Sequence, residues 1–345
     1  MKETNNMKDR NNMNERNNMN ETNNKKEANN MKEANNMKGT NNKEKVNNKE
    51  EANNMKKVNN KILKIDENQP QGLLVAIGGK EDKEEVLEIL TTLVSLVNSE
   101  SPKIEVITTA TNSPEETGQE YISAFSRGEE NSVRILNIDT REAANDTGLL
   151  ERIKAADIIF FTGGDQLRIT SILAGSLLME EIKRRYLEEH CIIAGTSAGA
   201  AAMSRTMIYG GAGNETHQKG TVHVGDGIGL IDNVIIDTHF VERGRFSRVM
   251  QVLSMNPVNI GIGLGEDAGI IIERGHIIRA IGTGMIVILD GQNLKYSNVA
   301  DIKFDEAIAM ENLIIHTIVE GHGFDLKGRK FLRPGDLSNL SVSSW

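Results

Sequence analysis

The sequence predicts an α/β fold: a mostly parallel sheet flanked by helices, with antiparallel strands added to its edge toward the C-terminus. Between residues 73 and 204, short apolar runs alternate with longer helical patterns, which indicates βαβ crossovers. The runs are apolar at every position, as in strands that helices cover on both faces. After about residue 220, closely spaced runs separated by glycine-containing turns predict the antiparallel additions.

The expected elements follow from these patterns in chain order. A strand is expected where a run is apolar throughout, and a helix where apolar residues recur among polar ones. The parallel part consists of strand and helix pairs at 73–77 and 83–97, 103–108 and 114–126, 132–138 and 140–155, 157–162 and 166–188, and 191–194 and 198–203. The later part consists of strands at 234–237, 259–264, 269–272, 276–281 and 285–289, with one helix at 245–254.

The segment 191–204, CIIAGTSAGAAAMS, carries the strongest functional signal. It predicts a buried strand, a tight turn and a helix, with Gly-x-Ser-x-Gly at the turn. Such a turn forces the serine into a strained backbone conformation that exposes its hydroxyl, and the flanking glycines avoid collisions. Ser197 is therefore the candidate nucleophile. A glycine-rich turn that only packs closely is the competing interpretation, because the pattern also arises by chance in roughly one chain of this length in ten.

Three loops follow the carboxyl ends of predicted parallel strands and should lie at one edge of the sheet. They contain Gly78-Gly79, Thr162-Gly163-Gly164-Asp165-Gln166 and the Ser197 turn. Gly-Gly pairs leave backbone N–H groups unobstructed, as the stabilisation of an oxyanion requires, and the N–H of Ala198 is the usual second donor. Neither Gly-Gly pair has the spacing of a nucleotide-phosphate loop.

A serine nucleophile needs a base, and the base needs a group that fixes its tautomer. Of the seven histidines, His239 ends the apolar run 234–236, again at a strand terminus. The other six lie at a helix end, in loops or turns, or in the C-terminal segment: His190, His217, His223, His276, His316 and His322. Glu266 follows the strand at 259–264 and is the candidate acid. The order Ser, His, Glu differs from that of α/β-hydrolases. A hydrogen-bonded structural histidine is the alternative role for His239.

Arg243, Arg245 and Arg248 lie just beyond His239. Forked guanidinium groups bind carboxylates in a bidentate manner, so these arginines are candidates for binding an acidic substrate. A solvated basic helix face is the alternative.

The N-terminal residues 1–60 differ from the rest of the chain. They are ten consecutive hexapeptides that each end in Asn-Asn, which predicts a disordered tail, and a solvated spacer is favoured over a nucleic-acid contact. They contain 13 Lys and Arg against 9 Asp and Glu, so the tail carries +4 and the remainder −13 of the chain's net charge of −9. We expect residues 61–345 to form a single α/β domain.

The one cysteine, Cys191, excludes an intrachain disulfide and argues against a multi-cysteine metal site. The sequence shows no apolar run long enough for a membrane span and no secretion signal, so we expect a cytoplasmic protein without a metal or cofactor.

Five motifs stand in one order along the chain: LLVAIGGKEDK at 73–83, FFTGGDQLRIT at 160–170, AGTSAGAAAMS at 194–204, DTHFVERGRFSRV at 237–249 and GIGLGEDAGIII at 261–272. Together they closely resemble the cyanophycinases, serine peptidases of a family that also contains the α-aspartyl dipeptidases. The resemblance covers residues 62–335 and implies a fold similar to class I glutamine amidotransferases and a homodimer.

Residue by residue, the resemblance implies Ser197 as nucleophile, His239 as base and Glu266 as its orienting acid. It implies an oxyanion hole formed by the backbone N–H groups of Gly164 and Ala198. The implied substrate pocket contains Gln166, Asp237, Arg243, Arg245 and Arg248. Thr238 departs from the glutamine expected in many relatives, and this bears on fine specificity.

The implied activity is hydrolysis of the aspartyl backbone of cyanophycin to β-Asp-Arg dipeptides through an acyl-enzyme. The alternative within the family is a peptidase that acts on short aspartyl peptides, like an α-aspartyl dipeptidase. From another class, a binding protein that keeps the serine turn only as scaffold is the alternative. An amidotransferase is disfavoured, because its nucleophile is cysteine and Cys191 lies six residues too early.

Overall fold

The structure, a computed structural model, describes residues 69–127, 131–211 and 217–340. The described residues all belong to one compact unit. The tail predicted at 1–60 lies outside the described residues. In the described ranges, none of the helices combines the length and apolar character that crossing a bilayer requires.

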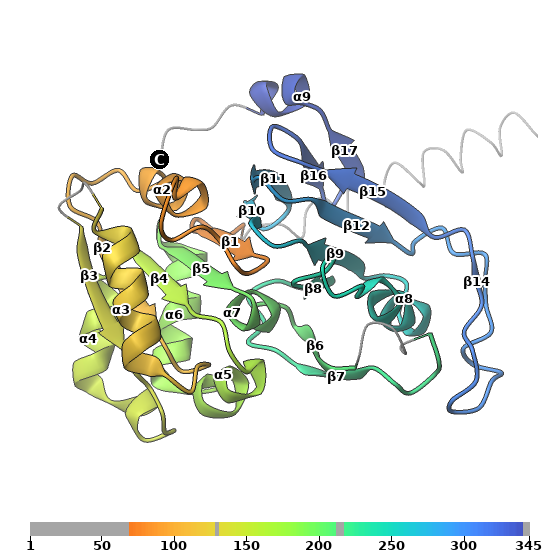
Figure 1. Ribbon diagram of the computed structural model, residues 1–345, viewed down its shortest axis with the longest axis horizontal. Coiled ribbons are helices and arrows are strands. Elements are labelled where there is room, and N and C mark those ends of the chain that lie inside the picture. Colours follow the sequence, from red (N-terminus) through yellow and green to blue (C-terminus); the bar gives the residue numbers. More distant parts are fainter. Residues whose placement is uncertain (1–68, 128–130, 212–216, 341–345) are drawn as a thin grey trace, which may run out of the picture. The chain divides into compact units, whose positions relative to one another are not determined.

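The main sheet of the described residues has nine strands in the order β17-β16-β11-β10-β1-β5-β4-β2-β3 (Figure 1). The strands from β1 to β3 in this order pair in parallel, and the strands from β10 to β17 are added in antiparallel pairs. Their bounds are β1 Leu73–Ile77, β2 Lys103–Ile107, β3 Ser132–Leu136, β4 Ile158–Phe161, β5 Ile192–Thr196, β10 Ala268–Glu273, β11 Ile277–Gly282, β16 Gly323–Asp325 and β17 Lys330–Leu332. This confirms the predicted fold class.

Helices cover both faces of the parallel strands (Figure 1). Because successive side chains of a strand point to opposite faces, Leu74 and Ala76 belong to one core cluster and Leu73 and Val75 to another. The second cluster is completed by α2 (Glu88–Ser95) and α3 (Pro114–Phe125). The first is completed by α4 (Thr147–Ala155), α5 (Gln166–Leu173), α6 (Leu177–Glu188) and α7 (Ala198–Ala202). Burial on both faces explains why these strands are apolar at every position.

Three of the later strands differ from the expectation, because they do not extend the main sheet. Together with a fourth strand that was not expected, β15, they form a separate sheet in the order β15-β12-β9-β8, in which only β8 and β9 are parallel. The bounds are β8 Val234–Asp237, β9 Ile260–Leu264, β12 Ile286–Asp290 and β15 Ile314–Ile318. α8 (Phe246–Met255) packs on β9 and completes a third core cluster. Two small hairpins accompany this sheet, β6 Thr206–Gly210 with β7 His223–Asp226 and β13 Tyr296–Ser297 with β14 Met310–Glu311.

Several helices begin or break at residues whose side chains bind backbone N–H groups. The helix expected from residue 83 begins only at Glu88, because the Asp82 carboxylate accepts hydrogen bonds from the four N–H groups of residues 84–87. The helix expected at 166–188 is two helices, which are separated at Gly175 and restarted by the Ser176 N-cap. Similarly, the Asp146 cap separates α4 from a short 3-10 turn, η1 Ala143–Asn145. A final helix, α9, spans Pro334–Asn339.

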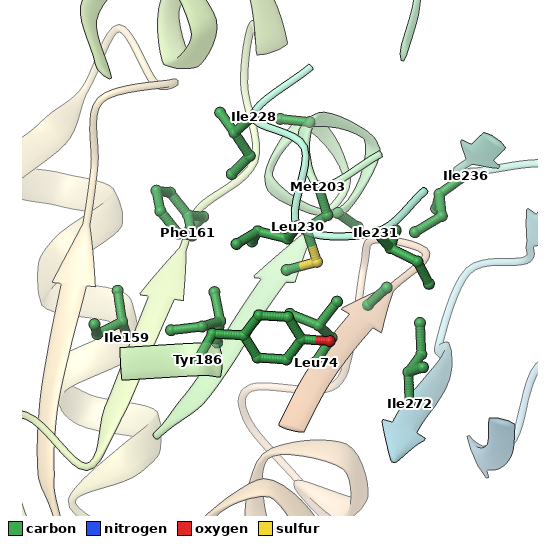
Figure 2. Close-up of a cluster of buried hydrophobic side chains, with 14 of the residues drawn as sticks. Leu74, Ile159, Phe161, Tyr186, Met203, Ile228, Leu230, Ile231, Ile236 and Ile272 are labelled. Carbon is green, nitrogen blue, oxygen red and sulfur yellow. The ribbon is translucent and has the colours of Figure 1, made fainter. Parts of the chain in front are cut away.

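A buried cluster joins the serine turn to the second sheet (Figure 2). Met203, just after α7, is fully buried with Leu74 of β1 and with Ile236 of β8. Burying such side chains contributes about 1.5–3 kcal/mol each. The chain entering β8 is also tied to α7, because Ile228 N donates to Ala202 O at 2.7 Å and Leu230 N to Met203 O at 2.8 Å. These contacts fix the strand that ends before His239 next to the turn that carries Ser197.

Candidate active site

Ser197 occupies the sharp turn between β5 and α7 with φ 50° and ψ −111°. Few non-glycine residues adopt this conformation, so the surrounding structure must hold it. The flanking glycines allow close packing: a Cβ on Gly199 would lie 2.4 Å from Phe161 O, and one on Gly195 would lie 2.8 Å from Gly199 C. The turn is therefore both closely packed and strained. Close packing at the glycines, the competing interpretation of the motif, does not exclude Ser197 as a nucleophile.

The structure brings Ser197, His239 and Glu266 into one line of hydrogen bonds. Ser197 Oγ lies 2.9 Å from His239 Nε2, and His239 Nδ1 lies 2.9 Å from Glu266 Oε1. The His239 side chain is 8% exposed and that of Glu266 19%, so water has limited access to this line. His239 itself has a positive φ of 47°, which turns the chain at the end of β8.

The loop after β1 holds the three segments together through its carbonyl groups. Ile77 O accepts from Ser197 N at 3.0 Å, Gly78 O from His239 N at 2.9 Å, and Gly79 O from Asp267 N at 3.0 Å. Gly79 has φ 102°, and a Cβ there would lie 2.4 Å from His239 Cε1. Only glycine therefore leaves room for the imidazole. The register of β1 with β5 pairs Ile77 with Thr196, so both strands end at the edge where the sequence predicted their loops to meet.

Comparison with known proteins places this chain in a family. Residues 73–280 match peptidase family S51. The chain belongs to this family. It is 35% identical over 261 residues to the cyanophycinase of Geminocystis herdmanii (strain PCC 6308), covering 76% of this chain and 95% of that protein. It is 34% identical over 259 residues to the cyanophycinase of Trichormus variabilis (strain ATCC 29413 / PCC 7937), covering 75% of this chain and 87% of that one.

A solved structure shows the same fold. A peptidase from an acI-B1 Actinobacterium superposes with a TM-score of 0.55 at 20% identity, covering 75% of this chain and 98% of that chain. The match to family S51 and the two cyanophycinase relatives confirm the family resemblance and the serine-type peptidase class predicted from the sequence. The roles of individual residues in this S51 peptidase stay predictions.

Of the two predicted oxyanion donors, Ala198 directly follows Ser197, and Gly164 follows Gly163, which lies beside Ser197. A Cβ on Gly163 would lie 3.4 Å from Ser197 Cβ, and Gly164 follows with φ 140° against Ala110 O, where a Cβ would come within 2.1 Å. Ala198 is the first residue of α7, so its N–H lacks an acceptor within the helix. The geometry is compatible with an oxyanion hole at this point.

Two of the predicted pocket residues are bound to each other. Both carboxylate oxygens of Asp237 accept from Arg248, whose Nη1 also donates to Gly211 O at 3.1 Å. Asp237 is 1% exposed and Arg248 4%, so this is a buried ion pair. The pair gives both residues a structural role, and it leaves their predicted contact with substrate untested.

The remaining predicted pocket residues are more accessible. Arg245 Nη1 donates to Thr238 O at 2.7 Å and lies 3.4 Å from Asp237 Oδ1. Burial lowers the pKa of Arg245 to about 10, at which the group is still a cation at neutral pH. Arg243 is exposed. Gln166, at the start of α5, donates from Nε2 to Ile208 O at 3.0 Å.

The electrostatics of the site favour a neutral imidazole and an ionised carboxylate. Burial lowers the pKa of His239; the contact with Glu266 opposes this shift, and the nearby cations of Arg243 and Arg245 add to it. The Lys80 ammonium is the main cause of a lowered pKa at Glu266. At neutral pH His239 can therefore accept a proton from Ser197, while Glu266 accepts the hydrogen bond from the other ring nitrogen.

Sequence reasoning missed two residues of the β1 loop. Lys80 Nζ lies 2.9 Å from Glu266 Oε2. Glu81 is 4% exposed and accepts hydrogen bonds from Tyr121 and, at 2.6 Å, from Thr196, the residue before Ser197. Their position directly after Gly78-Gly79, at the end of a predicted strand, was the available signal.

The described residues place neither a reactive thiol nor a cluster of metal ligands at this site. Cys191 is buried at the start of the β5 segment, and burial raises the pKa of its thiol to about 12. In the part of the chain that the structure describes, His, Cys, Asp and Glu side chains form no group of three or more that could hold a metal ion. The absence of a metal or cofactor from the reaction stays a prediction.

Proposed function

We propose that this S51 peptidase hydrolyses the aspartyl backbone of cyanophycin and releases β-Asp-Arg dipeptides through an acyl-enzyme on Ser197. The observation that carries the proposal is the line of hydrogen bonds from Ser197 through His239 to Glu266. The name of the two relatives, cyanophycinase, supports the choice of polymer.

In the proposed first step, Ser197 Oγ attacks an aspartyl carbonyl carbon and forms a C–O bond while its proton passes to His239 Nε2. The oxygen of the tetrahedral intermediate accepts hydrogen bonds from the N–H groups of Gly164 and Ala198. His239 then gives the proton to the departing backbone nitrogen, and the C–N bond breaks. Glu266 keeps the Nδ1 proton in place and stabilises the imidazolium that forms transiently.

In the second step, water replaces the amine. His239 Nε2 accepts a proton from the water, whose oxygen attacks the acyl carbon, and the ester bond to Ser197 Oγ breaks as the proton returns to the serine. The same three side chains therefore serve both steps, and the lowered pKa of His239 keeps the base neutral between them.

We assign substrate recognition to charges around this line. Arg243 and Arg245 are cations that act on His239, and their guanidinium groups suit carboxylates of the substrate. Arg248 and Asp237 act through their mutual ion pair, which positions the segment carrying His239. Gln166 lines the α5 side of the proposed pocket. Outside residues 1–60 the chain carries −13, which attracts the arginine side groups of the polymer.

The decisive experiment incubates purified protein with cyanophycin and identifies the products by mass. Release of β-Asp-Arg, abolished by Ser197→Ala, is the expected result. Undiminished release by Ser197→Ala would refute the acyl-enzyme. Cleavage of Asp-X dipeptides with intact polymer left behind would favour the dipeptidase alternative.

Two further expectations stay proposals. The homodimer is implied by the family resemblance alone, and sedimentation of the full chain tests it. The single domain at 61–345 and the tail at 1–60 are tested by limited proteolysis, which should remove the tail without loss of activity.

A further inference from the structure

Lys80 contacts the one oxygen of Glu266 that His239 does not use. Lys80 Nζ lies 2.9 Å from Oε2, and His239 Nδ1 lies 2.9 Å from Oε1. Each carboxylate oxygen thus has its own donor, on opposite sides of the group. With both oxygens occupied, the plane of the carboxylate is set relative to the imidazole ring.

The backbone around Lys80 is clamped to the turn that carries Glu266. On one side of Lys80, Gly79 O accepts from Asp267 N at 3.0 Å, and on the other, Asp82 N donates to Asp267 Oδ1 at 3.4 Å. These two contacts fix the backbone on both sides of Lys80 against Asp267, the residue after Glu266. The fold therefore places the backbone of Lys80 where its exposed side chain can contact Glu266.

The conformation of Lys80 is itself unusual. It has φ 50°, a left-handed conformation that lysine rarely adopts. Three other non-glycine residues with positive φ belong to the same site, namely Ser197, His239 and Asp267. Strained residues that gather at one place indicate a functional constraint on each of them. Lys80 shares this property with Ser197 and His239, and its ammonium contacts Glu266, the third member of the line.

We propose that Lys80 is a positioning residue, whose ammonium holds the Glu266 carboxylate toward His239 Nδ1 and so sets the orientation and basicity of the catalytic imidazole. This inference rests on the proposed function of the Ser197, His239 and Glu266 line. It adds Lys80 to that line as a residue that acts on His239 through Glu266.

The sign of the electrostatic effect follows from the neighbouring charges. Glu266 faces Lys80 and His239, with Asp267 beside it and Glu242 near Gly265; Arg243 and Arg245 act on His239. Loss of the Lys80 cation removes the main cause of the lowered pKa of Glu266, so the carboxylate becomes a stronger acceptor. The imidazolium is then stabilised, the pKa of His239 rises, and the base is neutral only at higher pH.

The test uses the rate at which diisopropyl fluorophosphate labels Ser197, measured against pH. Labelling needs the nucleophile and its base but no cyanophycin. The variants are Lys80→Met, which removes the charge and keeps the length of the side chain, and Lys80→Arg, which keeps the charge. Lys83→Met is the control for the loss of a neighbouring lysine, because Lys83 also follows β1 but its ammonium pairs with Glu120 at 2.7 Å and not with Glu266.

For Lys80→Met we expect a lower maximal labelling rate, by about threefold to tenfold, because the imidazole is less well oriented. The ratio of the rate at pH 8 to that at pH 6 should also rise about threefold, because a unit charge has been lost near the site. Lys80→Arg should restore both values, and Lys83→Met should match the wild type. The Lys80 side chain is 70% exposed, so the two Lys80 variants should unfold at temperatures similar to that of the wild type.

Every outcome bears on the proposal. If Lys80→Met matched Lys83→Met in both rate and pH dependence, the positioning role would be overturned. A variant that raised KM for cyanophycin with unchanged kcat would place Lys80 in substrate binding and also overturn it. If wild-type Ser197 were labelled normally but cyanophycin stayed intact, the proposed substrate would be wrong. The labelling rates of the Lys80 variants would still decide the positioning role. If wild-type Ser197 did not label, both proposals would fall.

Discussion

Two carboxylates at the ends of neighbouring strands, Glu266 and Asp237, have opposite surroundings. Asp237 ends β8 and is bound by a buried guanidinium, and the side chains of this pair, Asp237 and Arg248, are 2% and 5% exposed. Glu266 follows β9 and shares its charge between the imidazole of His239 and the exposed ammonium of Lys80. A carboxylate whose charge is cancelled by a buried partner stabilises structure. One whose partners are a base and a surface cation can act on that base.

Replacing Glu266 by Gln tests the catalytic side of this comparison and has the largest expected effect. The amide keeps the shape but loses the charge that fixes the His239 tautomer, so kcat/KM should fall by about 10³–10⁴-fold. The melting temperature should change little. Steady-state kinetics and thermal unfolding measure the two effects, and Ser197→Ala gives the background rate without the nucleophile. A variant that kept near wild-type turnover would show that Glu266 does not orient the base.

Replacing Asp237 by Asn tests whether this carboxylate stabilises the structure through its ion pair with Arg248. It leaves the Arg248 guanidinium buried without its counter-charge, which should cost about 3–5 kcal/mol in the free energy of unfolding. Urea denaturation gives this value. The double variant Asp237→Asn with Arg248→Met should recover part of the loss, since the buried guanidinium of Arg248 is removed together with its partner. Equal stability of the wild type and Asp237→Asn would contradict the difference drawn between the two carboxylates.

Gly79 makes room for the imidazole of His239, and replacing it tests whether the backbone also positions this base. In Gly79→Ala the new methyl group would lie 2.4 Å from His239 Cε1 at a φ of 102°, so the imidazole must move away from Ser197. We expect kcat to fall by about 10²-fold with a smaller change in KM. Gly335→Ala is the control, because an added Cβ there meets nothing within 4 Å. Similar kinetics for both variants would argue against this packing role.

The smallest expected effect concerns pH. Because burial lowers the pKa of His239, the neutral base should persist below the ordinary histidine value of about 6.5, and activity should rise with pH through a midpoint under that value. Arg243→Gln removes a cation that contributes to the shift, so this midpoint should move upward toward the ordinary value. A pH profile of kcat/KM tests both statements. A downward movement in Arg243→Gln would contradict the stated sign.

The sequence predicted most of the fold where the pattern is local. Apolar runs placed the parallel strands correctly, because strands buried on both faces need apolar side chains throughout. Helix ends were predicted less well, since capping depends on which side chain reaches which N–H. Asp82 delays the start of α2 in this way. The separate sheet formed by β8, β9, β12 and β15 was not predicted, because strand partners are set by contacts between distant segments.

The site shows the same division. The strained turn at Ser197 follows from adjacent small residues, and positions at strand ends pointed to His239 and Glu266. The pairing of Arg248 with Asp237 could not be predicted, because a run of arginines has the same pattern whether it faces a substrate or a buried carboxylate. Lys80 was missed because its relation to Glu266 spans two sheets and depends on a left-handed backbone.

By itself, the sequence determined the α/β class and the family, and it predicted a nucleophile, a base and an acid, because these depend on hydrophobic periodicity and short motifs. The tertiary structure alone decided the distances and the charge pairs: which carboxylate faces the imidazole, which is neutralised in the interior, and which lysine contacts the acid. Those choices depend on backbone dihedral angles and on packing between segments far apart in the chain, which one-dimensional spacing does not encode.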